Sequence, residues 1–220
     1  MGRELFIGDI HGCCETFKKL IERIELNKSD TLYFVGDYID RGPDSKGVID
    51  YILELREKGY SLHTLRGNHE QMMLDSLKEG GAFDLWMLNG GESTLESFGI
   101  SSAEGLDRPY MEFFSQTPHY VKTDKFIVVH AGLNFYADDP LADKDSMIWI
   151  RNFAVDRSYL NGRLLIHGHT PMDRESVVSQ EFEGPVNIDG GCVYGKAGFF
   201  GSLFALDLTG KEFIEVKNID

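Results

Sequence analysis

The stretch Leu5-Phe6-Ile7-Gly8-Asp9-Ile10-His11-Gly12 holds the pattern that decides the fold of this chain. Its apolar residues predict a short buried β-strand, Glu4–Ile7, and an aspartate and a histidine follow just after a glycine. Asp9 and His11 are two residues apart, so both side chains can point to the same side of an extended segment. Open α/β folds place their ligand sites at the carboxyl ends of strands, so we expect a polar site here.

Two further signatures have the same construction. Gly36-Asp37-Tyr38-Ile39-Asp40-Arg41-Gly42 follows the apolar run Thr31–Val35, and Gly67-Asn68-His69-Glu70 follows Ser61–Leu65. A turn aspartate and a surface histidine would explain any one of these signatures by itself. Three signatures about 30 residues apart, each at a strand end, indicate instead that the chain assembles them into one site.

The segments between the signatures predict helices, which makes the first half of the chain a βαβαβ unit with parallel strands. Apolar residues recur at helical spacing from Phe17 to Ile24, and a second helix is expected from about Ser45 to Lys58. The helices expected after the third signature are His69–Lys78, Ala82–Leu88, Gly91–Phe98 and Pro109–Gln116.

The second half of the chain is richer in strands. Those expected are His119–Lys122, Phe126–Val129, Leu164–Ile166, Val186–Ile188, Leu203–Asp207 and Glu212–Lys217. Two of these strands end in histidines, because His130 follows one and His167-Gly168-His169 follows another. The second half therefore brings further imidazoles to strand ends, and the fold class is α/β.

Length and composition fit a single globular domain over residues 1–220. The net charge of −14 argues against a general nucleic-acid binder, which needs a basic surface. It does not exclude a phosphorylated substrate, because bound divalent cations reverse the local sign of the charge.

The sequence also suggests where the protein works. No signal peptide fits an N-terminus that begins a strand almost at once, and no apolar stretch approaches the ~20 residues that span a bilayer. The three cysteines, Cys13, Cys14 and Cys192, have no metal-binding spacing and fit reduced thiols. We therefore expect a cytoplasmic protein without membrane contact, and a monomer.

Asp, Asn and His are the residue types that recur at the strand ends, and they suit Mn²⁺, Fe or Zn²⁺ better than Ca²⁺. Two cations about 3.5–4 Å apart need a bridging carboxylate, and Asp37 is the best placed because its strand is the middle one of the first three. The other ligands expected are Asp9 and His11 for one ion, and Asn68, His130 and His169 for its neighbour. We expect two divalent cations, Mn²⁺ in the first place, with Fe or Zn²⁺ as alternatives.

The sequence allows three roles for His167. It lies two residues before His169, so it is an alternative metal ligand, a residue that orients a ligand, or a packing residue.

Two such cations would share a water, lower its pKa towards neutrality and direct the hydroxide at a phosphorus atom. The leaving alkoxide then needs a proton. His69 stands beside Asn68 without an assigned metal, so it is the candidate general acid, and Asp40 could hold it in its cationic form.

Arginines are the candidate phosphate ligands. Arg41 offers a planar, permanently charged fork for phosphate oxygens, and Asn68 is also a candidate contact. Arg151 follows the apolar segment Met147–Ile150 and could bind the phosphate from another side, with Arg157 and Arg163 as competitors for that role.

Together these motifs resemble the phosphoprotein phosphatase branch of the calcineurin-like metallophosphoesterases, and in particular the small bacterial and bacteriophage lambda-type Ser/Thr protein phosphatases. The resemblance covers nearly the whole chain. Besides the first two signatures, the segments that carry it are Gly67–Met73, Leu88–Gly91, Ile148-Trp149 with Arg151, and Gly168-His169-Thr170-Pro171.

The resemblance implies a central αββα sandwich, with two mixed sheets flanked by helices. It also implies residue roles, which agree with those above: metal ligands Asp9, His11, Asp37, Asn68, His130 and His169, general acid His69 supported by Asp40, and phosphate contacts Arg41 and Arg151. The substrate implied is phosphoserine or phosphothreonine in a protein or peptide.

Two other functions remain open. The symmetrical dinucleoside tetraphosphate hydrolases of the same superfamily share the first, third and last motifs, but an alanine usually stands where this chain has Asp40. Asp40 therefore favours the protein phosphatases, although fold alone does not fix the substrate. A non-catalytic phosphate-binding module would have lost a ligand or the proton donor, whereas every candidate position here is filled.

Overall fold

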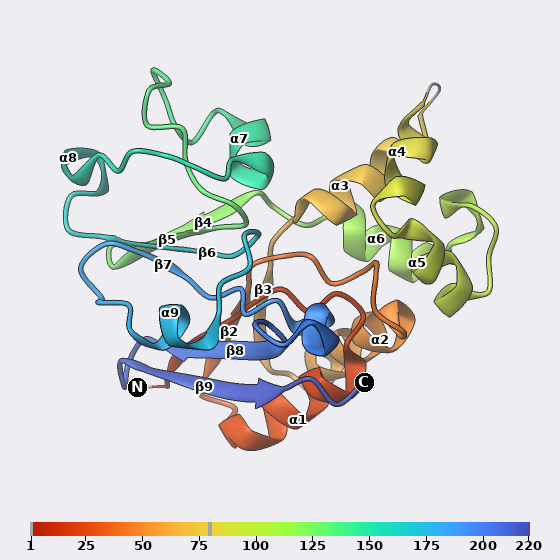
Figure 1. Cartoon of the computed structure of the whole chain (residues 1–220), viewed down its shortest axis with the longest axis horizontal. Helices are drawn as coiled ribbons and strands as arrows, with labels where there is room; N and C mark the ends of the chain where they lie inside the picture. Colours follow the sequence, from red (N-terminus) through yellow and green to blue (C-terminus); the bar gives the residue numbers. More distant parts are fainter. Residues whose placement is uncertain (1, 79–80) are drawn as a thin grey trace.

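The computed structural model describes residues 2–78 and 81–220, and it shows two mixed β-sheets that pack against each other between layers of helices (Figure 1). The strand order is β3-β2-β1-β8-β9 in the first sheet and β4-β5-β6-β7 in the second. This arrangement confirms the predicted αββα sandwich.

The first sheet combines the start and the end of the chain. Its strands are β1 (Glu4–Ile7), β2 (Thr31–Phe34), β3 (Ser61–Thr64), β8 (Ser202–Asp207) and β9 (Glu212–Lys217). The first three run parallel, as the crossover helices predict. The late strand β8 pairs antiparallel with β1, and β9 pairs antiparallel with β8.

The second sheet comes from the middle of the chain. Its strands are β4 (Tyr120–Lys122), β5 (Phe126–Val129), β6 (Leu164–His167) and β7 (Pro185–Asn187). Strands β5, β6 and β7 run parallel, so β5 and β6 both deliver their following residues to the same edge of the sheet. Strand β4 is antiparallel to β5 and closes the sheet on one side.

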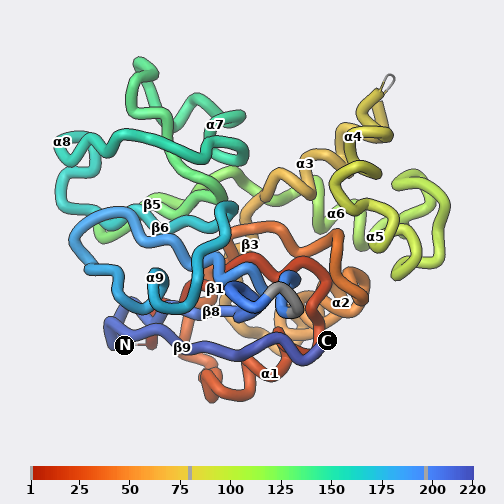
Figure 2. Tube along the Cα trace, in the orientation of Figure 1, coloured from red at the N-terminus to blue at the C-terminus, as the bar shows by residue number. Residues whose placement is uncertain are grey.

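The helices form three groups, which Figures 1 and 2 show around the sheets. Helices α1 (Cys14–Ile24) and α2 (Ser45–Glu57) cover the outer face of the first sheet. The group on the right of both figures consists of α3 (Asn68–Asp75), α4 (Ala82–Leu88), α5 (Gly91–Phe98), the 3₁₀ turn η1 (Ala103–Gly105) and α6 (Arg108–Ser115). Helices α7 (Lys144–Trp149) and α8 (Arg157–Leu160) cover the outer face of the second sheet, and two short elements complete the chain, α9 (Arg174–Val178) and the 3₁₀ segment η2 (Cys192–Ala197).

Residues in the central strands alternate between two apolar layers, because successive side chains of a strand point to opposite faces. In β1, Leu5 and Ile7 pack with the helices, whereas Phe6 packs between the sheets. In β5, Ile127 faces α7 and α8, whereas Phe126 meets Phe6 edge to face at 4.9 Å. Both faces of these strands are therefore buried, which explains why they read as continuous apolar runs.

The expected elements are present within a few residues of their predicted ends, and the short helices α7, α8 and α9 are the ones that the apolar spacing did not predict. These helices are too short to show a helical repeat. Each begins instead at an aspartate whose side chain accepts hydrogen bonds from backbone N–H groups, namely Asp143, Asp156 and Asp173. Over the described ranges, none of the helices combines the length and the apolar character that crossing a membrane requires.

Candidate metal centre

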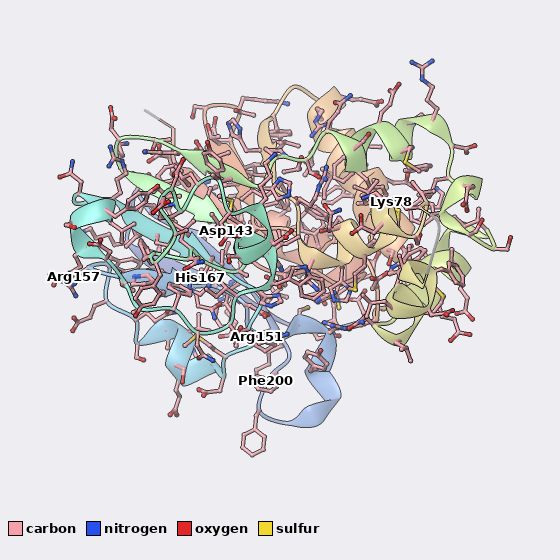
Figure 3. All side chains as sticks on the ribbon, turned by 90° about the horizontal axis from the view of Figure 1, so that it is seen from above. Lys78, Asp143, Arg151, Arg157, His167 and Phe200 are labelled. Carbon is pink, nitrogen blue, oxygen red and sulfur yellow. The ribbon has the colours of Figure 1, made fainter. Side chains whose placement is uncertain are left out.

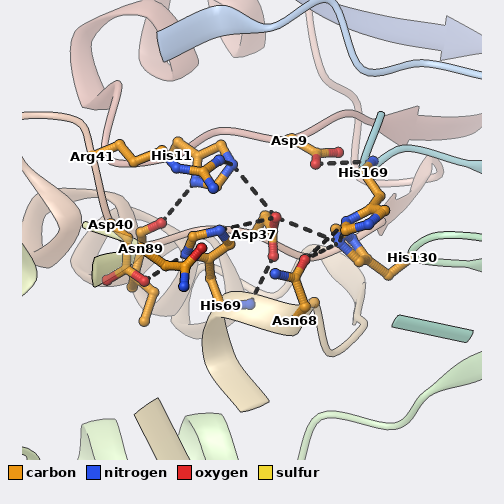
Figure 4. Close-up of polar contacts among 12 residues, drawn as sticks. Asp9, His11, Asp37, Asp40, Arg41, Asn68, His69, Asn89, His130 and His169 are labelled. Atoms are coloured by element: carbon orange, nitrogen blue, oxygen red, sulfur yellow. Dashed lines mark hydrogen bonds and ion pairs between the residues drawn. The ribbon is translucent and has the colours of Figure 1, made fainter. Parts of the chain in front are cut away.

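The segments that follow β1, β2, β3, β5 and β6 bring the predicted polar residues together, with Asp37 in the middle (Figure 4). Asp37 Oδ2 lies 3.4 Å from His11 Nε2 on one side and 3.4 Å from His130 Nε2 on the other. All three side chains are buried. Asp37 is thus placed between two groups of nitrogen donors, which is the position expected of a bridging carboxylate.

Two compact groups of possible ligand atoms share Asp37. One contains His11, Asp37 and His69, and its neighbour contains Asp37, His130 and His169. Asp9 belongs to neither compact group, although sequence reasoning paired it with His11, and His69 joins the first group although it was expected to stay off the metal.

The second group also includes Asn68, whose Oδ1 lies 3.0 Å from His130 Nε2 and 2.9 Å from His169 Nδ1. The two imidazole nitrogens are themselves 3.1 Å apart. His130 Nδ1 lies 3.0 Å from the Val35 carbonyl oxygen, which only an N–H can satisfy, so in the neutral ring Nε2 carries a lone pair. When the facing ring nitrogens carry no proton, their lone pairs and the Asn68 oxygen converge on one position, which fits a bound cation.

The first group has the same design. His11 Nδ1 donates to the Ile39 carbonyl at 2.9 Å, which turns the Nε2 lone pair towards Asp37. Arg41 Nη1 lies 3.0 Å from that nitrogen. The ring is therefore held in the tautomer that a metal ligand needs.

Asp9 contacts the second group through the backbone of His169. Its Oδ2 accepts a hydrogen bond from the His169 N–H at 3.0 Å. In the described part of the chain, Asp9 Oδ1 and His169 Nε2 are the buried side-chain polar atoms that have no hydrogen-bond partner. A buried polar atom without a partner is costly, so these atoms also fit a site that takes a cation.

The backbone around the centre is strained in the same places. The residues with positive φ include five of the predicted site residues, His11, Asp37, Asp40, Arg41 and His169. Such left-handed conformations are unfavourable for side chains other than glycine and concentrate at functional sites. Gly168 lets the last signature approach the first closely, because a Cβ at this position would lie 2.0 Å from Asp9 Oδ1.

His69 and Asp40 form a buried pair beside the first group. His69 Nδ1 lies 2.6 Å from Asp40 Oδ2, whereas its Nε2 lies 4.0 Å from Asp37 Oδ2. Asp40 also accepts hydrogen bonds from Trp86 Nε1 at 2.9 Å and from Thr94 Oγ1 at 2.6 Å. The carboxylate is fixed from three sides, so the imidazole that it contacts has one orientation.

The two arginines among the predicted phosphate ligands are exposed. Arg41 is exposed and its guanidinium lies 5.9 Å from the ring of Tyr194, which also is partly exposed. Arg151 is exposed, and its charge contributes to lowering the pKa of His169. Arg41 contacts the first group directly through His11, whereas Arg151 acts on the second group through its charge.

Most of the chain matches a known protein family. The model of the calcineurin-like phosphoesterase family matches residues 3–196. The chain belongs to this family. The enzymes of this family use divalent metal ions, and the two clusters around Asp37 could hold them.

The names of the relatives indicate different substrates. The chain is 30% identical to serine/threonine-protein phosphatase 1 of Salmonella typhimurium over 200 residues, which is 86% of each chain. It is 26% identical to the asymmetrical bis(5'-nucleosyl)-tetraphosphatase PrpE of Bacillus subtilis, over 97% of this chain and 91% of that protein. The crystal structure of a cold-active protein-tyrosine phosphatase from Shewanella superposes with a TM-score of 0.69 at 16% identity, covers 99% of this chain and 78% of its own, and shows likeness of fold alone.

Burial controls the titration of the imidazoles in this phosphoesterase. It lowers the pKa of His11 and of His169 to about 3, which keeps both rings neutral and ready to act as ligands. Burial acts in the same direction on His130, but the Asp37 carboxylate outweighs it and raises the pKa of His130 to about 9. In the metal-free protein a proton on His130 therefore compensates the charge of Asp37.

Glu70 is a buried carboxylate that sequence reasoning missed. It accepts hydrogen bonds at 2.9 Å from the backbone N–H groups of Asp37, Tyr38 and Gly67. It thereby ties the second signature to the third. Burial and the nearby Asp37 charge raise the pKa of Glu70 to about 7. Its position three residues after Gly67, at the start of a helix, was the signal that could have found it.

Asp189 is a second missed carboxylate. It is buried, accepts a hydrogen bond from the Gly191 N–H at 2.8 Å, and contributes to raising the pKa of Asp9. Burial raises the pKa of Asp189 itself to about 6. In the sequence, Asp189 directly follows the apolar run Val186–Ile188 and precedes Gly190-Gly191, and this position after a strand is the signal that could have found it.

His167 lies outside both compact groups. It is buried, its ring contacts Phe153 edge to face at 5.4 Å, and burial lowers its pKa to about 4. These contacts favour a packing role over a role as metal ligand.

Proposed function

We propose that the chain hydrolyses phosphate monoesters with two divalent cations, and that its substrates are phosphoserine and phosphothreonine in proteins or peptides. The cations would be held by Asp37 as bridge, by Asp9 and His11 on one side, and by Asn68, His130 and His169 on the other. Mn²⁺ is the ion that we propose first, because this mixed O/N donor set suits it. When bound, the ions supply an activated water nucleophile and neutralise phosphoryl charge.

The observation that carries the proposal is the His69–Asp40 pair beside the two groups around Asp37. An alkyl phosphate has a poor leaving group, so its P–O bond breaks readily only if the leaving oxygen receives a proton. His69 has Nδ1 engaged by Asp40, which leaves Nε2 as the nitrogen that donates this proton.

The other residues of the chain position the phosphate. Arg41 and Arg151 would bind its oxygens from opposite sides, with Asn68 as a further contact, and would compensate charge in the transition state. The oxygen of an attacking water would form the new bond to phosphorus while the P–O ester bond breaks and the ester oxygen takes the proton of His69. One proton of the water stays on the inorganic phosphate and the other returns to His69 through solvent, so that phosphate and an alcohol result.

A protein phosphatase is favoured by the acid–base pair and by the 30% identity to a protein of that name over 86% of both chains. The test is a kinetic panel with Mn²⁺ that compares p-nitrophenyl phosphate, a phosphoserine peptide and a phosphotyrosine peptide. We expect turnover of the first two. Absence of turnover on both, with metal bound, would refute the proposal.

Hydrolysis of dinucleoside tetraphosphates is the second candidate, because the PrpE relatives of Bacillus species carry that activity in their name. Those relatives are named asymmetrical, whereas the alternative expected from sequence was symmetrical cleavage. Product chromatography with diadenosine tetraphosphate separates the modes, since symmetrical cleavage yields two ADP and asymmetrical cleavage yields ATP and AMP. A rate far above that on the phosphopeptide would favour this candidate over ours.

We propose that residues 1–220 act as one domain, as a monomer, in the cytoplasm. Cys13, Cys14 and Cys192 are buried free thiols, which suits a reducing compartment.

A further inference from the structure

A cavity lies away from the metal centre, at the N-terminal ends of strands β5 and β6. Its volume is about 400 Å³. Lys125 comes just before β5 and Leu164 opens β6, and both line it, whereas His130 and His169 follow the far ends of the same strands. Arg157, which also lines the cavity, lies at the edge of the molecule in Figure 3, well separated from Arg151 of the metal centre.

The cavity is basic although the chain has a net charge of −14. Its charged lining residues are Lys125, Arg157, Arg163, Lys211 and one carboxylate, Glu183. Lys125 forms an ion pair with Glu4 at 3.1 Å. The other three cations form no ion pair with any residue that the structure describes. A cluster with excess positive charge on an acidic protein repels other cations and attracts a small polyanion.

The Arg163 side chain is fixed in orientation by the backbone. Its Nε donates to the Thr123 carbonyl at 2.9 Å and its Nη1 donates to the Leu160 carbonyl at 3.2 Å. Two backbone carbonyls therefore fix the guanidinium plane before any ligand arrives, which lowers the entropic cost of binding. The neighbouring Gly162, which also lines the cavity, has no atom within 4 Å of its Cβ position.

The remaining walls are apolar. Leu160 and Leu164, which are buried, and Phe182 and Leu208, which are partly exposed, also line the cavity. Phe182 is itself backed by the ring of Phe213, stacked with centroids 5.6 Å apart. The cavity therefore offers a supported aromatic face next to a basic rim, and its volume is in the range of small-molecule sites, about 300–1,000 Å³.

We propose that this cavity is a second binding site, separate from the metal centre, for a nucleoside diphosphate or a closely similar phosphorylated aromatic compound. The phosphates lie against Arg157, Arg163 and Lys211, and the base lies against Phe182. This inference does not depend on the proposed catalytic function.

The test is calorimetric titration of the full chain with α,β-methylene-ADP, which resists hydrolysis, and with methylenediphosphonate, which has the same phosphonate core without the nucleoside. The cavity variant is Arg157→Gln with Lys211→Gln, since both side chains are exposed and we expect the fold to tolerate their replacement. A second variant, Arg41→Gln with Arg151→Gln, weakens anion binding at the metal centre. The charge-matched control is Lys18→Gln with Lys19→Gln on α1, which removes two exposed cations elsewhere.

We expect the cavity variant to weaken binding of α,β-methylene-ADP about tenfold or more, because it removes two phosphate contacts. The metal-centre variant and the control should retain at least one binding event of unchanged affinity. Binding that the cavity variant leaves unchanged would overturn the proposal, and so would the absence of any binding that survives the metal-centre variant.

Methylenediphosphonate should bind more weakly than the nucleotide, and Phe182→Leu should reduce this difference. Equal affinity for both probes would overturn the nucleoside part of the proposal. As a measurement that needs no variant, the backbone amide resonance of Gly162 should shift when α,β-methylene-ADP is added to the wild-type chain, and a fixed resonance at saturating probe would count against the site.

Discussion

Asp40 Oδ2 lies 2.6 Å from His69 Nδ1, and both side chains are buried. This contact determines which nitrogen of His69 faces the metal centre, since the nitrogen on the Asp40 side is engaged. The imidazole therefore presents Nε2 towards the metal centre, 4.0 Å from Asp37 Oδ2.

We predict that His69→Asn slows hydrolysis of alkyl phosphates by about 10²–10⁴-fold, the usual contribution of a general acid. The effect should be much smaller on p-nitrophenyl phosphate, because its leaving group needs no proton. Steady-state rates on both substrates measure the difference. Metal content, measured by elemental analysis, should stay at two ions per chain, and loss of an ion would mean that His69 is a ligand instead.

Trp86→Phe should weaken the orientation of Asp40. The substitution keeps a buried aromatic ring but removes the N–H that donates to Asp40 at 2.9 Å. Hydrogen bonds to charged groups contribute about 1.5–3 kcal/mol, so kcat on alkyl phosphates should fall about tenfold or more while KM changes little. Phe83→Leu, in the same helix, is the control, and an equal loss of kcat there would assign the effect to packing.

Asp37→Asn should disrupt both halves of the metal centre at once, because Asp37 contacts His11 and His130 at 3.4 Å each. We expect metal content after dialysis to fall from two ions towards none, with secondary structure retained by circular dichroism. A variant that still holds two ions would show that Asp37 does not bridge them.

Gly168→Ala tests the close approach of the last signature to the first. The added Cβ would lie 2.0 Å from Asp9 Oδ1, so Asp9 must move and metal affinity should drop about tenfold or more. Gly184→Ala is the matched control, because nothing lies within 4 Å of its Cβ position. Titration with Mn²⁺ by calorimetry compares the two, and equal affinities would contradict the prediction.

The ion pair of Arg3 and Asp30 should make stability fall in acid. Burial alone would raise the pKa of Asp30, but hydrogen bonds from Arg3 and Asn27 outweigh it and lower the pKa below 3.8. A carboxyl whose folded pKa is depressed stabilises the protein above its unfolded pKa, and this stabilisation is lost as pH falls through the folded value.

Asp30→Asn removes that titration. The difference in unfolding midpoint between wild type and Asp30→Asn should be constant above about pH 5 and shrink between about pH 4 and pH 2. Urea unfolding at several pH values measures it. A difference that stays constant to pH 2 would show that Asp30 is not the titrating group.

Sequence alone predicted the residues whose positions follow from strand ends. Asp37 and His130 each come within two residues of a buried apolar run, and parallel strands bring such residues to one edge. The pairing of β8 with β1 was not predicted, because strand order depends on contacts between distant segments.

The supporting residues could not be predicted in the same way. Trp86 and Thr94 reach Asp40 from helices α4 and α5, and their spacing in the sequence says nothing about this meeting. From the sequence, Trp86 is predicted to be an ordinary core residue of an apolar helix. Its polar N–H acquires a role only when folding places Asp40 within hydrogen-bond distance.

The hydrogen bond between Asp9 and His169 joins residues 160 positions apart. The strand that pairs with β1 on its other side, β8, also comes after His169 in the chain. On the ribosome, the segment with Asp9, His11 and Asp37 emerges long before His130 and His169 are made. At that stage the nascent chain holds only part of the candidate ligand set around Asp37. A metal centre built from these residues would therefore be complete only after the segment with His169 has been made.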